Sequence, residues 1–291
     1  MDRRVEYGKE AWFVTSTGAK LFYRDFAPAQ PVGAVPLLCL HGFMRNSRDF
    51  CELGRTFAAK GVRVVAPDLR GRGFSARYSD AKDYHYDLVV RDVKDLLDHL
   101  DIGPVVVVGV ALGGIIAIDM AGESGTRVAG IVLNDLGAEI VEHSAQKMAG
   151  NVDASDFSFD EAVARVKLQF GKTYPDLPDE CWVDLMLRAY RELTPGRYAR
   201  DLDLRSLVDA QRMKVERPDL WPQFLATRGV PVALLRGETS DFFTADCAER
   251  MVEAHADTVL TTVKGRGHPP LLDEPESLAA IEALLQRASR R

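Results

Sequence analysis

Short apolar runs alternate with segments of helical periodicity through most of the chain. The apolar runs lie at 35–40, 62–66, 105–108, 128–133, 230–235 and 259–263. They are continuous rather than alternating, which is typical of strands buried on both faces of a parallel sheet. Apolar residues at helical spacing predict helices over 48–60, 86–100, 115–121, 244–254 and 274–287. Strands joined by helices in this way predict an α/β fold with a mostly parallel sheet.

Two regions depart from this alternation. Runs at 12–15 and 21–26 flank Ser16-Thr17-Gly18 and predict an antiparallel hairpin. Between about 136 and 228 no strand-like run is found, and helical patterns cover 159–170, 178–192, 202–213 and 220–227. Such an insertion predicts a helical cap over 137–228, above the edge of the sheet where these folds bind ligands. The core would then comprise 1–136 and 229–291.

Candidate chemistry first shows where the run 105–108 ends. Gly109-Val110-Ala111-Leu112-Gly113 has the form G-x-S-x-G with alanine at the serine position. In that motif a strand turns sharply into a helix and holds a nucleophile at the tip of the turn. Alanine has no group that attacks a carbonyl. The pattern therefore predicts a catalytic turn without its nucleophile.

A base and an acid are expected on loops that follow later strands. His268 lies after the last apolar run, in Gly-Arg-Gly-His-Pro-Pro, and is the predicted base. Asp241 follows the run 230–235 and is the predicted acid, since the order nucleophile, acid, base suits this kind of site. Asp135, directly after the run 128–133, is the alternative acid. Glu238 is a poorer candidate because it lies earlier in its turn.

Backbone amides near the same turn are expected to stabilise a developing oxyanion. The N–H of Leu112 follows the nucleophile position and opens a helix, whose dipole favours negative charge. The second donor is expected after His41-Gly42, at Phe43. His41 itself is interpreted as structural, beneath this loop.

These pieces together resemble the α/β-hydrolase superfamily over nearly the whole chain. The matching segments are Leu40-His41-Gly42-Phe43, 66–75, 109–114, 236–241 and Gly267-His268. The resemblance implies an eight-stranded sheet, a helical cap and a Ser-His-Asp triad, and the chain departs from it at Ala111. Epoxide hydrolases and haloalkane dehalogenases have Asp at that position. Carbon–carbon hydrolases usually have a Gly-Pro-Gly oxyanion loop, which 43–47 does not match. A carboxylic ester or lactone hydrolase remains the favoured interpretation, with a carbon–carbon hydrolase as an alternative.

The substrate is less well defined by the sequence. Aromatic residues of the predicted cap suit an apolar or aromatic ester or lactone. Arg45 and Arg48 follow the oxyanion loop and are able to receive a carboxylate, or else to lie in solvent. The expected substrate-binding residues are Arg45, Trp182, Tyr190 and Trp221. Phosphate-loop, metal and flavin motifs are not found, so no cofactor is expected.

Composition is that of an ordinary globular protein. Of 291 residues, 46% are hydrophobic and 27% are charged, and the net charge of −6 includes no basic block. Nucleic acid and membrane are therefore not expected partners. Four scattered cysteines and an N-terminus without an apolar segment favour a cytoplasmic setting. The oligomeric state stays open, a homodimer included.

Three interpretations of Ala111 are compatible with the sequence. The residue replaces a native serine in an inactive variant, or the chain is a natural non-hydrolytic relative that uses His268 and Asp241 for proton transfer or lyase chemistry. In the third, the chain is a small-molecule binding protein on a hydrolase scaffold. An otherwise complete site favours the first.

Overall fold

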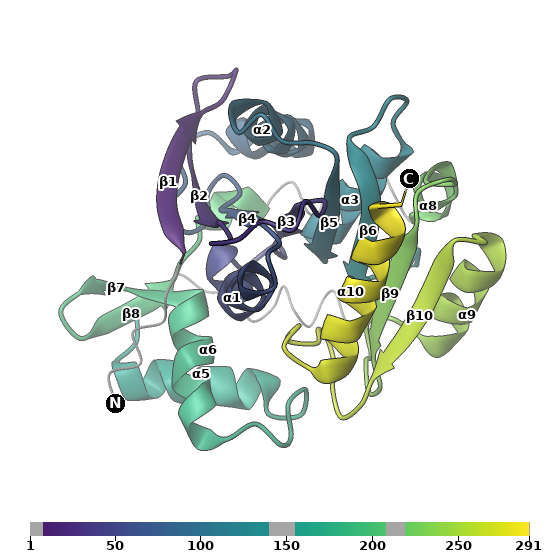
Figure 1. Cartoon of the computed structure of the whole chain (residues 1–291). Helices are drawn as coiled ribbons and strands as arrows, with labels where there is room; N and C mark the ends of the chain where they lie inside the picture. The colour runs from purple at the N-terminus through teal and green to yellow at the C-terminus, as the bar shows by residue number, and fades with distance from the viewer. Residues whose placement is uncertain (1–7, 140–154, 208–218, 291) are drawn as a thin grey trace.

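One eight-stranded sheet runs through the molecule in the order β1-β2-β4-β3-β5-β6-β9-β10, in a computed structural model (Figure 1). The structure describes residues 8–139, 155–207 and 219–290. β1 (Lys9–Val14) and β2 (Lys20–Phe26) form the antiparallel hairpin, and β2 also pairs antiparallel with β4 (Val64–Pro67). The remaining pairs are parallel. Their strands are β3 (Leu37–Leu40), β5 (Val105–Val110), β6 (Val128–Asn134), β9 (Val232–Gly237) and β10 (Thr258–Val263).

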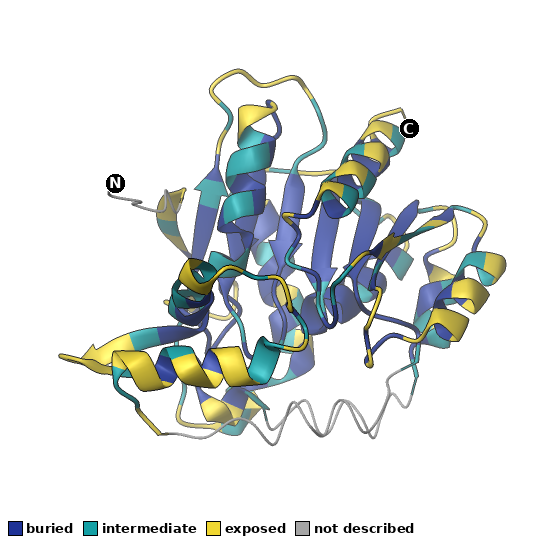
Figure 2. Cartoon of the chain, turned by 90° about the horizontal axis from the view of Figure 1, so that it is seen from below, coloured by how far each residue is buried: buried dark blue, intermediate teal, exposed yellow. Residues whose placement is uncertain are grey.

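Helices cover both faces of the sheet, which explains the continuous apolar runs. Alternate residues of each central strand enter opposite cores, as Val105 and Val106 do. One core is closed by α2 (Tyr86–His99), α3 (Leu112–Gly122), α8 (Trp221–Ala226) and α9 (Ala245–Ala254). The other is closed by α1 (Cys51–Ala59) and α10 (Pro275–Ala288). In Figure 2 the central strands of the sheet are accordingly dark blue, and exposed residues lie on loops, outer helix faces and outlying strands such as the hairpin after α6. The predicted α/β fold with its mostly parallel sheet is confirmed.

The segment between β6 and β9 contains a hairpin that the helical pattern did not predict. α5 (Phe159–Phe170) agrees with the prediction, but α6 (Asp179–Ala189) ends earlier than 192. β7 (Tyr190–Thr194) and β8 (Arg197–Arg200) follow it and pair antiparallel. The turn at Pro195-Gly196, with φ +74° at Gly196, reverses the chain there. Within the predicted helix 202–213, a short 3-10 turn covers Leu204–Leu207, and 208–213 fall outside the described residues.

Two glycines allow the close approach of strand and helix at the end of β5. A Cβ at Gly113 would overlap the Leu40 carbonyl oxygen, and one at Gly109 would overlap the backbone of Gly113 and Gly114. Because neither glycine has a Cβ, the backbone of α3 packs closely against the end of the sheet. In the part of the chain that is described, no helix is long and apolar enough to cross a bilayer.

We expect Gly113→Ala to lower the free energy of unfolding by about 3 kcal/mol or more, because backbone must move to admit the methyl group. Urea unfolding followed by circular dichroism measures the change. Gly130→Ala is the matched control, since its Cβ would lie 3.4 Å from Leu284 Cγ. That variant should stay within about 1 kcal/mol of the parent. Similar losses in both would contradict the close-packing argument.

Candidate active site

Ala111 lies at the tip of a sharp turn between β5 and α3. Its φ of 45° and ψ of −110° are unusual for a residue with a side chain. The amides of Gly114 and Ile115 donate to its carbonyl oxygen at 2.9 and 3.0 Å, which starts α3. Ala111 is 6% exposed, and it lines a cavity. The predicted strand–turn–helix is therefore present, with a methyl group at the tip.

His268 and Asp135 form a buried pair beside this turn. Nδ1 of His268 lies 2.8 Å from Oδ2 of Asp135. The Asp135 carboxylate is fully buried and also accepts from the Gly237 amide at 2.8 Å and from the Ser240 hydroxyl at 2.6 Å. With its Nδ1 proton directed at the carboxylate, the imidazole keeps a lone pair on Nε2. Nε2 has no hydrogen-bond partner within the described ranges, and His268 lines the same cavity as Ala111.

Asp241 was the predicted acid, but the structure pairs His268 with Asp135, the alternative. Both residues follow buried parallel strands, but Asp241 is exposed at the rim of the cavity. Ser240 instead directs its hydroxyl at Asp135 and accepts the amides of Phe242 and Phe243. These bonds turn the loop after β9 toward the end of β6. The sequence pointed to Asp135 only through its position directly after a buried strand, which is why it was named as the alternative acid.

The expected oxyanion donors lie next to Ala111. The amides of Phe43 and Leu112 have no acceptor among the residues that the structure describes. Phe43 lines the cavity, and a Cβ at Gly42 would lie 3.6 Å from that of Ala111. Unpaired amides beside a nucleophile position are what an oxyanion requires. Their role stays a prediction, although their placement suits it.

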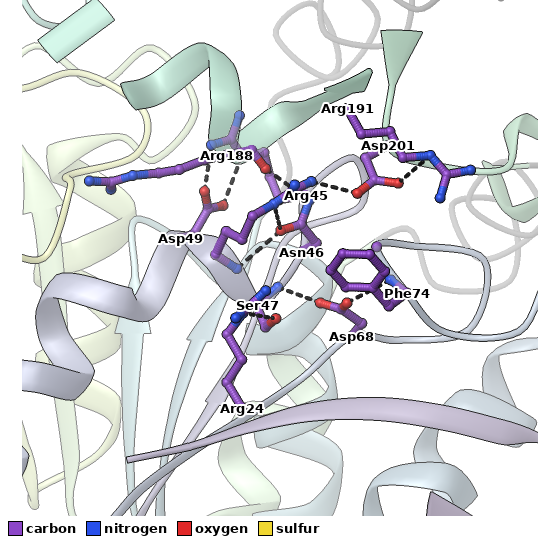
Figure 3. Close-up of polar contacts among 12 residues, drawn as sticks. Arg24, Arg45, Asn46, Ser47, Asp49, Asp68, Phe74, Arg188, Arg191 and Asp201 are labelled. Atoms are coloured by element: carbon purple, nitrogen blue, oxygen red, sulfur yellow. Dashed lines mark hydrogen bonds and ion pairs between the residues drawn. The ribbon is translucent and has the colours of Figure 1, made fainter. Parts of the chain in front are cut away.

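The loop that follows Phe43 is fixed by buried polar contacts. The Asp68 carboxylate accepts from the amides of Ser47 and Phe74 at 2.7 and 2.8 Å, and Arg24 donates to the Ser47 hydroxyl at 3.1 Å (Figure 3). Arg48 binds Asp201 at 2.5 Å and does not line the cavity. These contacts fix the main chain of the loop and leave the Phe43 amide without an acceptor among the described residues.

His41 lies beneath the same loop, where it was expected to be structural. It is fully buried; Nδ1 donates to the Gly42 carbonyl at 2.8 Å, and Nε2 accepts from the Leu69 amide at 3.0 Å. Burial lowers the pKa of His41 to about 3. The neutral ring therefore holds the loop to the turn after β4.

The depressed pKa of His41 predicts a loss of stability in mild acid. The unfolded chain binds a proton near pH 6.5, whereas the folded chain binds it only near pH 3, so stability falls as the pH falls through this window. Between pH 6 and pH 5 this one group should remove about 1 kcal/mol. Urea unfolding at both pH values measures it. His41→Gln does not titrate, so a slope as steep in that variant would contradict the prediction.

The cavity above Ala111 has a volume of about 670 Å³ and is walled by both the core and the inserted segment. Arg45 lines it as expected, but Trp182, Tyr190 and Trp221 are not among the described residues that do. Trp182 and Tyr190 pack inside the core of the insertion, and the Trp221 indole donates to Glu139 at 2.8 Å. The apolar wall includes two aromatics of the predicted cap, Phe170 and Tyr174, and residues that the sequence did not single out: Val166, Leu185, Phe242 and Leu271. Helical periodicity does not tell which side of a helix meets the cavity and which packs on its neighbours.

The cavity is lined by His268, which forms an acid–base pair with Asp135. Within residues 8–139, 155–207 and 219–290, no group of three His, Cys, Asp or Glu side chains is placed to hold a metal ion. The Phe242 ring stacks on the His268 imidazole, with centroids 4.1 Å apart. This contact and the Asp135 bond fix both the plane and the tautomer of the ring. A base held in this way is ready to accept a proton on Nε2.

Comparison with known proteins places the chain among hydrolases. The model of the Alpha/beta hydrolase family matches residues 37–281. A solved alpha/beta hydrolase from Novosphingobium aromaticivorans is 32% identical, covers 97% of this chain and 99% of its own, and has a TM-score of 0.86. The 3-hydroxybutyrate-oligomer hydrolase of Cupriavidus necator is 26% identical over 86% of this chain and 87% of its own length. A thermophilic esterase from Thermogutta terrifontis, 20% identical with a TM-score of 0.70 and coverage of 97% and 100%, shares the fold. The chain therefore belongs to the alpha/beta hydrolase family.

Proposed function

We propose that the cavity is an acyl-transfer site for carboxylic esters or lactones, and that Ala111 occupies its nucleophile position. The pairing of His268 with buried Asp135 beside the strained turn at Ala111 carries this proposal. In the present sequence the site binds an ester but forms no acyl-enzyme. The test is ester hydrolysis by the Ala111→Ser variant, with the parent chain as the baseline.

With serine at position 111, each group has a defined step. The serine Oγ attacks the ester carbonyl, and Nε2 of His268 accepts its proton. Asp135 stabilises the imidazolium, and the amides of Phe43 and Leu112 receive the oxyanion. When the tetrahedral intermediate collapses, the C–O bond breaks and His268 returns the proton to the leaving alcohol. Water then repeats the sequence on the acyl-enzyme and releases the acid.

We further propose that Ala111 stands in place of a native serine. The turn holds φ at 45° and Asp135 is a buried carboxylate, and both features cost stability. A strained turn is expected where it presents a nucleophile, and the bond from Asp135 to His268 serves an imidazole that accepts a proton. The Cupriavidus relative is named for the hydrolysis of a hydroxy-acid oligomer, which supports an ester as the substrate class.

A second candidate uses His268 and Asp135 without a covalent step. The free Nε2 of His268 is able to remove a proton from a bound ligand or from water. This version predicts turnover by the parent chain itself, and that turnover should be lost in His268→Ala. A binding protein, in contrast, would retain ligand affinity and show no turnover in either form.

A further inference from the structure

Charged side chains from the core and from the inserted segment gather around the cavity. The described lining residues carry four cations, Arg45, Lys172, Arg188 and Arg200, and two carboxylates, Asp49 and Asp241. We propose that Arg188 binds a free carboxylate of the substrate, so that the substrate class is an ester or lactone that carries a second, ionised carboxylate. This inference rests on the proposed function and defines its substrate.

Arg188 combines burial with unused donors. It lies in the last turn of α6, and its side chain is 12% exposed. Nη2 contacts Asp184, one turn earlier in the helix, and Asp184 does not line the cavity. Nε and Nη1, which carry three N–H groups, have no partner in the described part of the chain. Buried guanidinium donors are normally satisfied, and a carboxylate fits them in geometry and charge.

The neighbouring arginines have their own partners. Arg45 directs Nε and Nη2 at the two oxygens of Asp49, at 2.7 and 2.5 Å, so its charge is neutralised within the cavity wall. Arg200 donates to Gln169 at 2.6 Å and lies over the Tyr190 ring, 5.1 Å from its centroid. Lys172 is exposed to solvent, so Arg188 is the lining cation that combines unpaired donors with shielding from water.

The main chain of Arg188 is fixed relative to the oxyanion loop. Its carbonyl oxygen accepts from the Asn46 side-chain amide at 2.8 Å, and Asn46 follows Phe43 by three residues (Figure 3). Asn46 is itself buried and caps the 3-10 turn at Ser47–Phe50. An anion on Arg188 would thus sit at a set position relative to an ester carbonyl at Ala111. Val166, Phe170 and Leu185 line the same cavity and suit the carbon atoms that join the two groups.

Binding by the parent chain tests this inference without any turnover. Calorimetric titration at pH 7 compares monomethyl glutarate, which keeps one carboxylate, with the neutral dimethyl glutarate. We expect the monoester to bind at least tenfold more tightly, the effect of charge-assisted hydrogen bonds in a partly desolvated site, about 10- to 100-fold. Arg188→Gln should abolish this preference, and Arg188→Lys should keep part of it.

Arg191→Gln is the matched control, because Arg191 lies three residues away, pairs with Asp201 at 3.3 Å and does not line the cavity. It should keep the full preference. Equal binding of the two esters, no binding of the monoester, or an undiminished preference in folded Arg188→Gln would overturn the carboxylate site. Hydrolysis of neutral esters by Ala111→Ser is a separate result, so the proposed function is able to stand when the carboxylate site fails.

Discussion

Ala111→Ser is expected to convert this chain into an active esterase. The variant should hydrolyse p-nitrophenyl acetate and butyrate about 10⁴- to 10⁶-fold faster than the parent, the range by which removal of a serine nucleophile slows comparable enzymes. Serine adds one oxygen atom to the side chain of a residue whose backbone φ is already 45°. The cavity beside that side chain has room for the oxygen. Release of p-nitrophenolate measures the rate.

A covalent probe distinguishes two reasons for a lack of hydrolysis: the absence of a reactive nucleophile, and the use of an ester that the site does not accept. A fluorophosphonate should add its mass to Ala111→Ser and leave the parent chain unmodified. The double variant Ala111→Ser/His268→Ala should lose both the hydrolysis and most of the labelling, because the serine then has no base. A folded Ala111→Ser protein that neither hydrolyses these esters nor reacts with the probe would refute the acyl-transfer proposal.

Asp135 and Asp241 should differ sharply when each is replaced in the Ala111→Ser background. We expect Asp135→Asn to lower kcat about 10³- to 10⁴-fold, because the imidazolium loses its counter-charge and the tautomer is no longer fixed. Asp241→Asn should stay within about threefold of the parent rate, since Asp241 is exposed at the cavity rim. Steady-state kinetics on one ester measures both.

Stability has to be followed alongside these rates. Asp135 accepts three hydrogen bonds while buried, so Asp135→Asn is expected to lower Tm as well as kcat. Rates are therefore compared at a temperature where every variant is folded by circular dichroism. A large loss in Asp241→Asn together with a small one in Asp135→Asn would restore the acid that the sequence favoured.

The features predicted well are those that depend on local pattern. Continuous apolar runs reported strands covered on both faces, and the order of strands and helices predicted the parallel sheet. The turn at Ala111 was visible because Gly109 and Gly113 are needed where strand and helix nearly touch. His268 was singled out because its loop follows the last strand and is constrained by glycine and proline, and it lines the same cavity as Ala111.

The acid residue could not be chosen from the chain alone. Asp135 and Asp241 both follow buried parallel strands, and β6 and β9 are neighbours in the sheet. The choice depends on Ser240 and Gly237, whose donors converge on Asp135 from the next strand. Such a convergence joins residues about a hundred positions apart, and no local pattern records it.

The sequence by itself determined the fold class, the turn that presents Ala111 and the loop of His268, because each follows from the order of nearby residues. Only the tertiary structure decided which carboxylate meets His268 and which side chains line the cavity. It also placed Arg188 on that cavity and Trp182 and Tyr190 in the core of the insertion. The reason is that a helix has several faces, and what each face contacts depends on segments that are distant in the chain.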